Sequence, residues 1–418
     1  MIEYRKYILD NGLTLLTHEA WDTPLASTCL IYSVGSRDEE PARTGFAHLF
    51  EHLMFGGTRA VPDFDGAVSA MGGECNAFTN CDYTCYHMTV PADMLGDALA
   101  LEADRMTGLE ISPKTLAVQQ RVVTEEYHQR YMNQPYGDVW LLLRPLCYKV
   151  HPYRWATIGA DIRHVAEATL DDVQAFHTRY YRPDNAILAV AAPMKHEEIL
   201  KIVESEKWKT EGLSTLHSPL STYPQEPPQT GARMLRVQRP VPATKVFLAY
   251  HTGDYTDPLY RACDLTTDIL ANGTSSRMHR RLVVESGMMS EADAYLSGDM
   301  GPGLLVLSGT LARGVTPEEG IDALREFGLQ IADEGVNPQE LQKVQNKYEN
   351  TFVFSQYRAA DRALGLCYYT WLGDTSLVNR EPEMYRRVTT ADIEAAARSV
   401  FRMQNENTLI YEAEGNNS

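Results

Sequence analysis

The sequence predicts an α+β fold made of two duplicated domains, each a mainly antiparallel sheet backed by helices. Three observations lead to this prediction. Strand-like and helix-like segments mix in blocks, a proline-rich stretch divides the chain near its middle, and segments of the first half recur in the second. The 418 residues are also more than one compact core needs, so two domains are expected.

The first half begins with a hairpin and continues with further strands and helices. Residues 6–17 form two strand-like runs around Asn11 and Gly12, a pair that favours a tight hairpin turn. Strand-like runs predict two further strands, at residues 26–33 and 85–90. Helical patterns predict four helices, at residues 45–55, 63–71, 94–106 and 113–131.

Residues 211–231 have the composition of an extended linker between the halves. This stretch contains four prolines together with Ser, Thr and Gly, and it shows neither helical nor strand periodicity. The predicted organisation is therefore an N-terminal repeat at 1–210, the linker, and a C-terminal repeat at 232–418.

Two pairs of segments indicate the internal duplication. Residues 111–120 match residues 336–345, since each segment places a capping residue before a Pro and a helix-forming run. Residues 170–176 match residues 390–396, and a short strand-like segment follows each of them.

The charge balance restricts the partners. Asp and Glu number 56 against 38 Lys and Arg, a formal net charge of −18. A surface this acidic repels phosphate backbones, so we expect no nucleic acid as a partner. It would attract a basic or unfolded polypeptide, although plain solubility explains the charge equally well. No apolar run approaches the roughly 20 residues of a membrane helix. The N-terminus lacks a signal-peptide core, so we expect no membrane association and a cytoplasmic location.

The seven cysteines are scattered and contain no C-x-x-C pair, which favours free thiols over a disulfide framework. Cys81 and Cys85, with Cys75 nearby, suggest a metal site at first sight. They lie in a β-like stretch, however, and their spacing is not one that structural zinc sites prefer. Packing or exposed thiols are therefore the preferred interpretation.

The sharpest local feature is the spacing His-x-x-Glu-His at His48, Glu51 and His52. Helical residues four apart lie on one face, so both imidazoles can bind one metal ion, and Glu51 shares that face. Apolar neighbours indicate that the helix is buried, where a His pair needs partners. The spacing is that of the inverted zinc-peptidase motif. The alternative is a core His pair with a capping or surface Glu.

A tetrahedral zinc site with an open position needs a third protein ligand. A long helical stretch offers the adjacent carboxylates of Glu125 and Glu126, which point about 100° apart, so only one can face the metal. His128 is also close in sequence. Spacing alone does not choose among the three, and a solvated acidic pair on a helix face is the alternative.

Four stretches together match one known pattern. They are Gly-Ser-Arg at 35–37, the motif with its flanks at 45–58, a Gly-Gly-x-x-Asn-Ala-Phe-Thr signature within 72–86, and Val-Val-Thr-Glu-Glu at 122–126. The chain resembles the pitrilysin/insulinase family of zinc peptidases, close to the mitochondrial processing peptidase group. The resemblance spans both halves, and it implies two duplicated α+β domains that face each other across a cavity.

The resemblance also implies roles for particular residues. Zinc would be the cofactor, with His48, His52 and Glu126 as its ligands. Glu51 would be the general base that activates water for attack on a peptide carbonyl. An edge strand that pairs with the substrate would comprise Asn76, Ala77, Phe78 and Thr79. Ordinary edge pairing or core packing is the alternative for that strand.

Two departures from the family pattern affect the prediction. Gln119 stands where the family often has Glu, so a carboxylate that tunes the site is missing. Catalytic assemblies of the family also use an Arg and a Tyr, seven residues apart, to hold or polarise the substrate. These positions fall on Val283 and Ser290 here. A shifted register is the alternative, with Arg280 or Arg281 and Tyr295.

The resulting hypothesis is a zinc metalloendopeptidase that acts on peptides or unfolded polypeptides. In heterodimeric members of the family, one subunit carries the metal motif and another supplies the Arg and Tyr. This chain is therefore expected to be the metal-bearing subunit, with a second family subunit or a second copy of itself as partner. A non-catalytic scaffold subunit of the same fold is the alternative. Hydrolysis of small amides is a third possibility, which would leave the substrate-pairing strand without a purpose.

Overall fold

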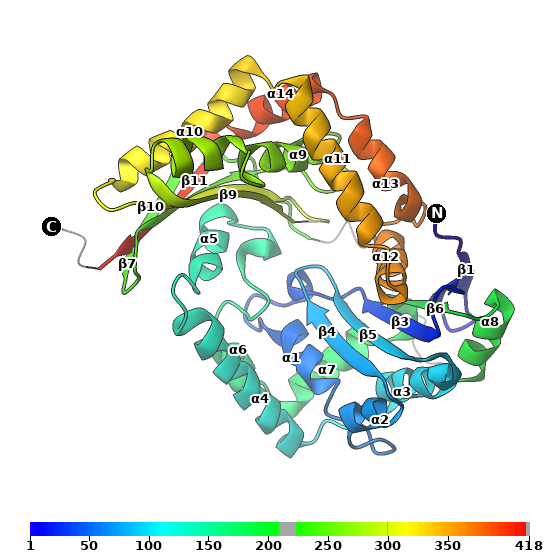
Figure 1. Ribbon diagram of the computed structural model, residues 1–418. Coiled ribbons are helices and arrows are strands. Elements are labelled where there is room, and N and C mark those ends of the chain that lie inside the picture. The colour runs from blue at the N-terminus through cyan, green and yellow to red at the C-terminus, as the bar shows by residue number, and fades with distance from the viewer. Residues whose placement is uncertain (207, 209–222, 299, 415–418) are drawn as a thin grey trace. The chain divides into compact units, whose positions relative to one another are not determined.

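The computed structural model describes residues 1–206, 208, 223–298 and 300–414 (Figure 1). They form two compact units, each assembled from both halves of the chain. Unit 1 contains Met1–Tyr127, Ala156–Thr222 and Phe352–Glu381, and unit 2 contains His128–Trp155, Tyr223–Thr351 and Pro382–Ser418. Within the predicted linker 211–231, residues 211–222 lie outside the described part of the chain.

The sheet of unit 1 is mainly antiparallel, as predicted. Among the described residues its six strands follow the order β1-β2-β6-β3-β5-β4, and only β2 and β6 pair in parallel. In sheet order the strands are β1 (Arg5–Ile8), β2 (Thr14–Glu19), β6 (Ala186–Ala192), β3 (Leu25–Tyr32), β5 (Thr84–Pro91) and β4 (Glu74–Thr79). The helices of this unit include α1 (Phe46–Leu53), α2 (Phe64–Ala70), α3 (Leu95–Gly108), α4 (Pro113–Tyr127), α6 (Arg163–Ala166), α7 (Leu170–Tyr180), α8 (His196–Ser205) and α12 (Ala359–Trp371).

Helices cover both faces of this sheet, which is why its central strand β3 is buried along nearly its whole length. On one face, Cys367 of α12 donates a hydrogen bond from Sγ to the carbonyl oxygen of Cys29, at 3.1 Å. On the other face, the guanidinium of Arg105 in α3 lies 4.3 Å from the ring centroid of Tyr86 in β5. Figure 1 shows α12 and α3 on opposite sides of the strands.

The sheet of unit 2 has five strands in the order β7-β11-β8-β10-β9, and among them only β7 and β11 pair in parallel within the described residues. In sheet order these are β7 (Arg233–Arg239), β11 (Glu406–Ala413), β8 (Lys245–His251), β10 (Leu304–Leu311) and β9 (Met289–Ser297). Its helices include α5 (Val139–Cys147), α9 (Tyr260–Ala271), α10 (Pro317–Glu334), α11 (Pro338–Phe354) and α14 (Thr390–Val400). Alternate residues of β8, Val246, Leu248 and Tyr250, enter a buried cluster with α9, α10 and α14.

The two units repeat one strand order. The order β2-β6-β3-β5-β4 in unit 1 corresponds to β7-β11-β8-β10-β9 in unit 2, with the parallel pair at the same place in each. The edge strands agree in detail, because Asn76 Oδ1 accepts the N–H of Ala77 in β4, and Asp293 Oδ1 accepts the N–H of Ala294 in β9, both at 2.8 Å. The duplication predicted from the sequence is therefore visible in the fold.

The two pairs of matching sequence segments make equivalent hydrogen bonds in the two units. Gln120 Nε2 donates to the carbonyls of Val165 and Ala168, at 2.9 Å each, and so ties α4 to the segment before α7. Gln345 Nε2 donates to three carbonyls just before α14. Reciprocal capping boxes at Thr169 and Thr389 then begin α7 and α14.

The compact units differ from the continuous ranges 1–210 and 232–418 expected from the sequence. Helix α5 belongs to unit 2, where it packs against β7, β8 and β11, and α12 belongs to unit 1, where it packs against β3 and β6. The physical reason is burial, since β3 and β6 have two apolar faces and α12 covers one of them with residues such as Ala363, Leu366 and Cys367. Each half of the chain thus contributes a helix to the other unit.

The elements predicted for the first half are confirmed, with one difference at a helix end. The hairpin corresponds to β1 and β2, the two strands to β3 and β5, and the helices to α1–α4. Helix α4 ends at Tyr127, and residues predicted to continue it form a π-helical turn, η3 (His128–Met132). Among the described residues no helix is both long and apolar enough to cross a bilayer. The cytoplasmic location stays a prediction.

Replacing Gln345 by Ala should lower the free energy of unfolding by about 1–3 kcal/mol, because buried carbonyls before α14 lose their donor. Urea denaturation followed by circular dichroism measures the change. Gln342, on the same helix, bonds only to the exposed Asn346 amide among the contacts described, so Gln342→Ala is the matched control and should change stability little. Equal effects of the two substitutions would contradict the anchoring role.

Candidate metal centre

Helix α1 begins at a glycine that no other residue can replace without strain. Gly45 has φ +90°, and a Cβ atom there would lie 2.7 Å from Val165 Cγ2 and 2.8 Å from the Ile158 carbonyl oxygen. The first turn is capped from outside the helix by the buried Glu39, whose carboxylate accepts the N–H groups of Gly45 and Ala47, both at 2.9 Å. A negative charge at a helix N-terminus also interacts favourably with the helix dipole.

The two motif histidines lie on one face of α1, as predicted. His48 is buried, with 9% of its surface exposed, and His52 is partly exposed. Their ring centroids are 4.9 Å apart, with the rings nearly perpendicular at 81°. Leu49, Phe50 and Leu53 bury the opposite side of the helix, so the orientation of both imidazoles follows from packing.

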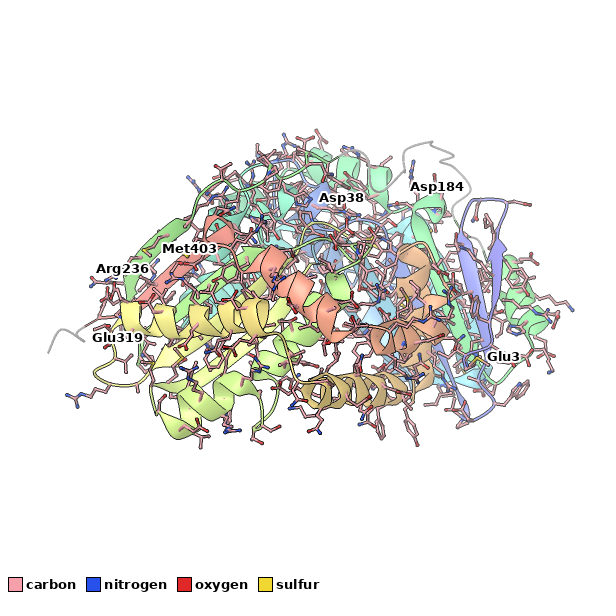
Figure 2. The ribbon with its side chains drawn as sticks, turned by 90° about the horizontal axis from the view of Figure 1, so that it is seen from above. Glu3, Asp38, Asp184, Arg236, Glu319 and Met403 are labelled. Carbon is pink, nitrogen blue, oxygen red and sulfur yellow. The ribbon has the colours of Figure 1, made fainter. Side chains whose placement is uncertain are left out.

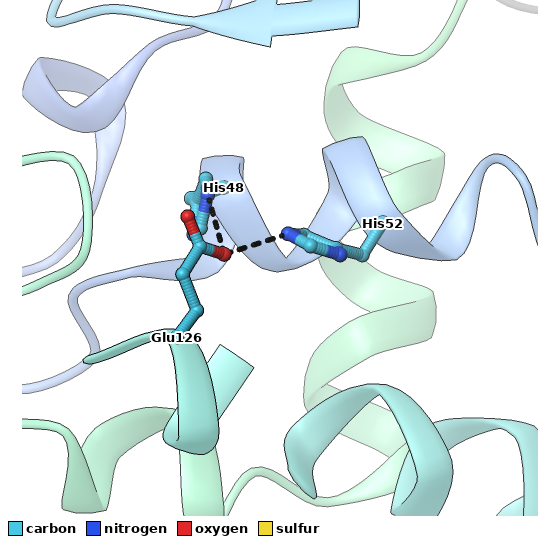
Figure 3. A group of neighbouring side chains, drawn as sticks. All are labelled: His48, His52 and Glu126. Atoms are coloured by element: carbon cyan, nitrogen blue, oxygen red, sulfur yellow. Dashed lines mark ion pairs between the residues drawn. The ribbon is translucent and has the colours of Figure 1, made fainter. Parts of the chain in front are cut away.

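Glu126 of α4 completes the group (Figure 3). Its Oε2 lies 3.6 Å from His48 Nε2 and 3.2 Å from His52 Nε2. Ligand atoms around tetrahedral zinc lie about 3.3–3.6 Å apart, because each is about 2.0–2.2 Å from the ion. Two imidazoles and a carboxylate with this spacing fit a zinc ion that keeps an open position. In the described part of the chain, no other His, Cys, Asp or Glu group of three or more has such spacing.

The rotation of α4 selects Glu126 among the three candidates that the sequence left open. Val123 is fully buried and lies one helical turn before Glu126, so the two share the inward side of α4. Glu125 is exposed, and His128 is exposed in the π-helical turn η3. Gln119 is half-buried on α4.

The segment around Val165 contacts both α1 and α4, the two helices that carry the candidate metal ligands. The Val165 side chain abuts Gly45 at the start of α1, and the Val165 carbonyl accepts the hydrogen bond of Gln120 from α4. The distance between His48 and Glu126 therefore depends on this short segment, which lies in α6. Neither Gln120 nor Glu39 was assigned a role from the sequence; only the recurrence of Gln120 at Gln345 offered a signal.

Glu51 lies on α1 between the two histidines and is partly exposed. Burial raises the pKa of the Tyr86 and Tyr181 hydroxyls, and the charge of Glu51 contributes to both shifts in the same direction. Both tyrosines therefore stay neutral, and the Tyr86 hydroxyl donates a hydrogen bond to the Phe50 carbonyl oxygen of α1 at 3.3 Å.

Strand β4 is the free edge of its sheet, as the resemblance implied. Within the described residues it pairs with β5 on one side only, and it packs against α1. Asn76 is exposed, and Ala77, Phe78 and Thr79 are partly exposed. The Ala77 N–H donates to the side chain of Asn76, so it points away from β5. An extended peptide could pair with this edge.

The positions expected for an Arg and a Tyr lie in unit 2. Val283 falls in the π-helical turn η6 (His279–Glu285), and Ser290 is exposed in the edge strand β9. In the shifted register, Arg280 pairs with Glu285 at 2.7 Å and Arg281 pairs with Glu326 at 3.0 Å. The guanidinium groups of that register are therefore already engaged by carboxylates. Tyr295 lies against Trp140, with ring centroids 6.1 Å apart.

The cysteines do not form a metal site. All seven are free thiols. Cys85 is buried in β5, where its Sγ contacts that of Cys29 at 3.4 Å, and Cys81 is partly exposed after β4. The interpretation as packing or exposed thiols holds within the described residues, because none of the cysteines belongs to a group with metal-ligand spacing.

Two family models match the chain. The one described as "Insulinase (Peptidase family M16)" matches residues 15–139, and the one described as "Peptidase M16 inactive domain" matches residues 167–348. The chain belongs to the insulinase family of peptidases, M16. The first match contains the whole group of His48, Glu51, His52 and Glu126.

Individual M16 proteins match both halves of the chain. The zinc protease PqqE of Helicobacter pylori is 30% identical over 297 residues, which cover 70% of this chain and 66% of the relative. A protein of Streptomyces coelicolor named as a zinc protease is 27% identical over 423 residues, covering 95% of this chain and 87% of the relative. A solved structure of a Helicobacter pylori protease has the same fold, with a TM-score of 0.92 at 24% identity, and covers 99% of this chain and 100% of that chain.

Substituting Gly45 by Ala should weaken zinc binding by roughly 10- to 100-fold, the range typical of residues that orient metal ligands. The added Cβ meets Val165 and Ile158, and φ is unfavourable for Ala, so α1 must shift relative to α4. Competition with a chromogenic chelator measures the affinity. Gly96→Ala in α3 is the matched control, since a Cβ there meets only Ile202 at 3.8 Å. If Gly45→Ala bound zinc as the control does, the proposed constraint on α1 would be wrong.

Proposed function

We propose that this chain is a zinc metalloendopeptidase that hydrolyses peptide bonds in peptides or unfolded polypeptides. The observation that carries the proposal is the convergence of His48, His52 and Glu126 within ligand distance of one another. These three side chains would hold the zinc ion, and Glu51 would accept a proton from the water that attacks the peptide bond. Membership of a family whose relatives are named zinc proteases supports the same conclusion.

Zinc, when bound, polarises the carbonyl of the scissile peptide bond and lowers the pKa of the attacking water. Glu51 then accepts a proton from this water and passes it to the nitrogen of the leaving amine. The buried position of His48 and the capped start of α1 keep the donors in place without rearrangement. The residues of the protein thus supply orientation and proton transfer.

The edge of β4 supports a polypeptide as substrate. An extended peptide can add to β4 as a further strand, with its carbonyl taking the place of Asn76 Oδ1 on the Ala77 N–H. Backbone pairing of this kind selects peptides by their extended conformation and not by a particular sequence. Folded proteins usually shorten, charge or cover their edge strands, so peptides and unfolded chains are the expected substrates. The net charge of −18 favours basic ones.

We further propose that the enzyme works with a second family subunit, which supplies an Arg and a Tyr to the substrate. Val283 and Ser290 stand at the corresponding positions of this chain, and the nearby Arg280 and Arg281 are paired with carboxylates. A homodimer of this chain would lack the pair as well, so a partner of different sequence is the better match.

A non-catalytic scaffold subunit is the second candidate function. It is favoured by the missing Arg and Tyr and by the match of residues 167–348 to a model described as an inactive domain. The complete group in unit 1 argues against it, because a scaffold gains nothing from two histidines and a carboxylate held together in a mostly buried site.

Glu51→Gln should retain about one zinc per chain but lose peptide hydrolysis by about 10²- to 10⁴-fold, the contribution of a general acid–base group. Elemental analysis and a quenched fluorescent peptide provide the two measurements. Glu126→Gln should lose zinc, whereas Glu125→Gln, the exposed neighbour on α4, should keep both zinc and turnover. Turnover that persists in Glu51→Gln would refute the assignment of Glu51 as the general base.

The partner hypothesis predicts that the peptidase activity of this chain rises when the missing Arg and Tyr are introduced. Val283→Arg combined with Ser290→Tyr should raise kcat/KM of the isolated chain by at least about tenfold, since such groups stabilise charge in the transition state. Val284→Arg with Ser286→Tyr, both at exposed sites outside the pattern, is the matched control. No gain, together with full activity of the unmodified chain alone, would refute the need for a partner.

A further inference from the structure

Arg37 and Asp82 form a buried ion pair in unit 1, which also contains the candidate metal centre. Arg37 Nη1 donates to Asp82 Oδ1 at 2.7 Å, and the two residues are only 4% and 2% exposed. Arg37 belongs to the short helix η1 (Ser36–Asp38; Asp38 is labelled in Figure 2). Asp82 lies in the turn that joins β4 to β5. The pair therefore connects the segment before α1 to the end of the edge strand.

Backbone contacts reinforce this connection. The N–H groups of Ser36 and Arg37 donate to the carbonyls of Asn80 and Cys81, at 3.2 and 2.9 Å. A Cβ atom on Gly35 would lie 2.4 Å from the carbonyl carbon of Cys81, so only glycine allows the two backbones to approach this closely. Main-chain hydrogen bonds thus hold the segment 35–37 against the turn between β4 and β5. The ion pair adds a side-chain contact between the same two segments.

The same segment controls the position of α1. Glu39, two residues after Arg37, caps the first turn of α1 through Gly45 and Ala47, and η1 itself packs against α1. The segment 35–39 is therefore one hydrogen-bonded connection between α1 and the end of β4. It acts beside the direct packing of α1 on β4 and the hydrogen bond from the Tyr86 hydroxyl of β5 to the Phe50 carbonyl of α1. A change in the shape of this segment should alter the offset between the candidate metal ligands and the edge strand.

The chemistry of the pair suits a positioning role. A buried ion pair adds little net stability compared with apolar packing, but its geometry is sharply defined, because a displaced partner leaves an uncompensated buried charge. Arg37 is held on a second side by Trp371 of α12, whose ring centroid lies 5.6 Å from the guanidinium carbon. The pair thus resists sliding of the turn relative to α1.

We infer that Arg37 and Asp82 are positioning residues that set the register of β4 against the metal centre, so that a peptide paired along β4 presents its scissile bond to the site. This inference rests on the proposed peptidase function. It predicts that the pair matters for substrates that pair with the whole of β4, and not for the binding of zinc.

The test compares two quenched fluorescent peptides, one long enough to pair along all of β4 and one truncated so that it reaches no farther than Ala77. In Arg37→Met, kcat/KM for the long peptide should fall roughly 10- to 100-fold, the cost of a displacement of about 1 Å. The loss should appear in kcat as well as in KM, because the scissile bond is displaced and the strand pairing is weakened. Zinc content should stay unchanged, and the truncated peptide should be affected much less. Arg37→Lys, which keeps the charge but not the planar fork, should recover part of the loss.

A matched control separates positioning from general stability. Arg325 pairs with the buried Glu406 in unit 2, so Arg325→Met removes a comparable ion pair away from β4. It should lower the melting temperature without changing the ratio of kcat/KM between the two peptides. Asp82→Asn removes the ion pair through its other partner. It provides the same test if Arg37→Met does not fold.

The outcomes distinguish this inference from the proposed function. Equal losses for both peptides, loss of zinc in Arg37→Lys, or unchanged kinetics in all variants would overturn the positioning role. If the protein with bound zinc cleaved neither peptide, both unmodified and with Val283→Arg and Ser290→Tyr installed, the proposed function would fail instead. The affinity of Glu51→Gln for the long peptide would then test the positioning role. The expected result is weaker binding when Arg37→Met is combined with Glu51→Gln.

Discussion

The site depends on one buried interaction, the contact of the Glu39 carboxylate with the N–H groups that begin α1. The helix starts at a glycine in the left-handed region and has no capping side chain of its own, so its first turn would otherwise leave buried donors unsatisfied. Once the start of α1 is held, the helical repeat directs His48 and His52 to one side. The remaining requirement is that α4 brings a carboxylate to the same place, which Gln120 and the Val165 segment ensure.

The duplicated fold uses the same scaffold for two purposes. Gln120 and Gln345 make equivalent bonds, and each ties its helix to the segment before a helix that begins with a capping box. Six residues after Gln120 stands the candidate ligand Glu126, whereas six residues after Gln345 stands Thr351. The second unit therefore keeps the architecture and the anchoring glutamine but not the candidate metal ligand, and most of it lies within the match to an inactive-domain model.

The edge strand and the metal helix are coupled through a short path. The segment 35–39 touches the turn after β4 at one end and the first turn of α1 at the other. Because both contacts are buried and directional, the fold itself sets the offset between β4 and the candidate ligand atoms. For the proposed peptidase function, such preorganisation would reduce the reorganisation that catalysis requires.

The amino-acid sequence by itself determined the elements, the duplication and the pair His48 and His52. Hairpin turns, helical periodicity and the spacing of four residues are local properties, so they can be read without the fold. It did not determine the choice of Glu126 over Glu125 without the family resemblance, nor the roles of Glu39, Arg37 and Gln120. These depend on the rotation of α4 and on contacts between segments far apart in the chain. The exchange of α5 and α12 between the units has the same origin, because which apolar face covers which sheet is decided only when the whole chain packs.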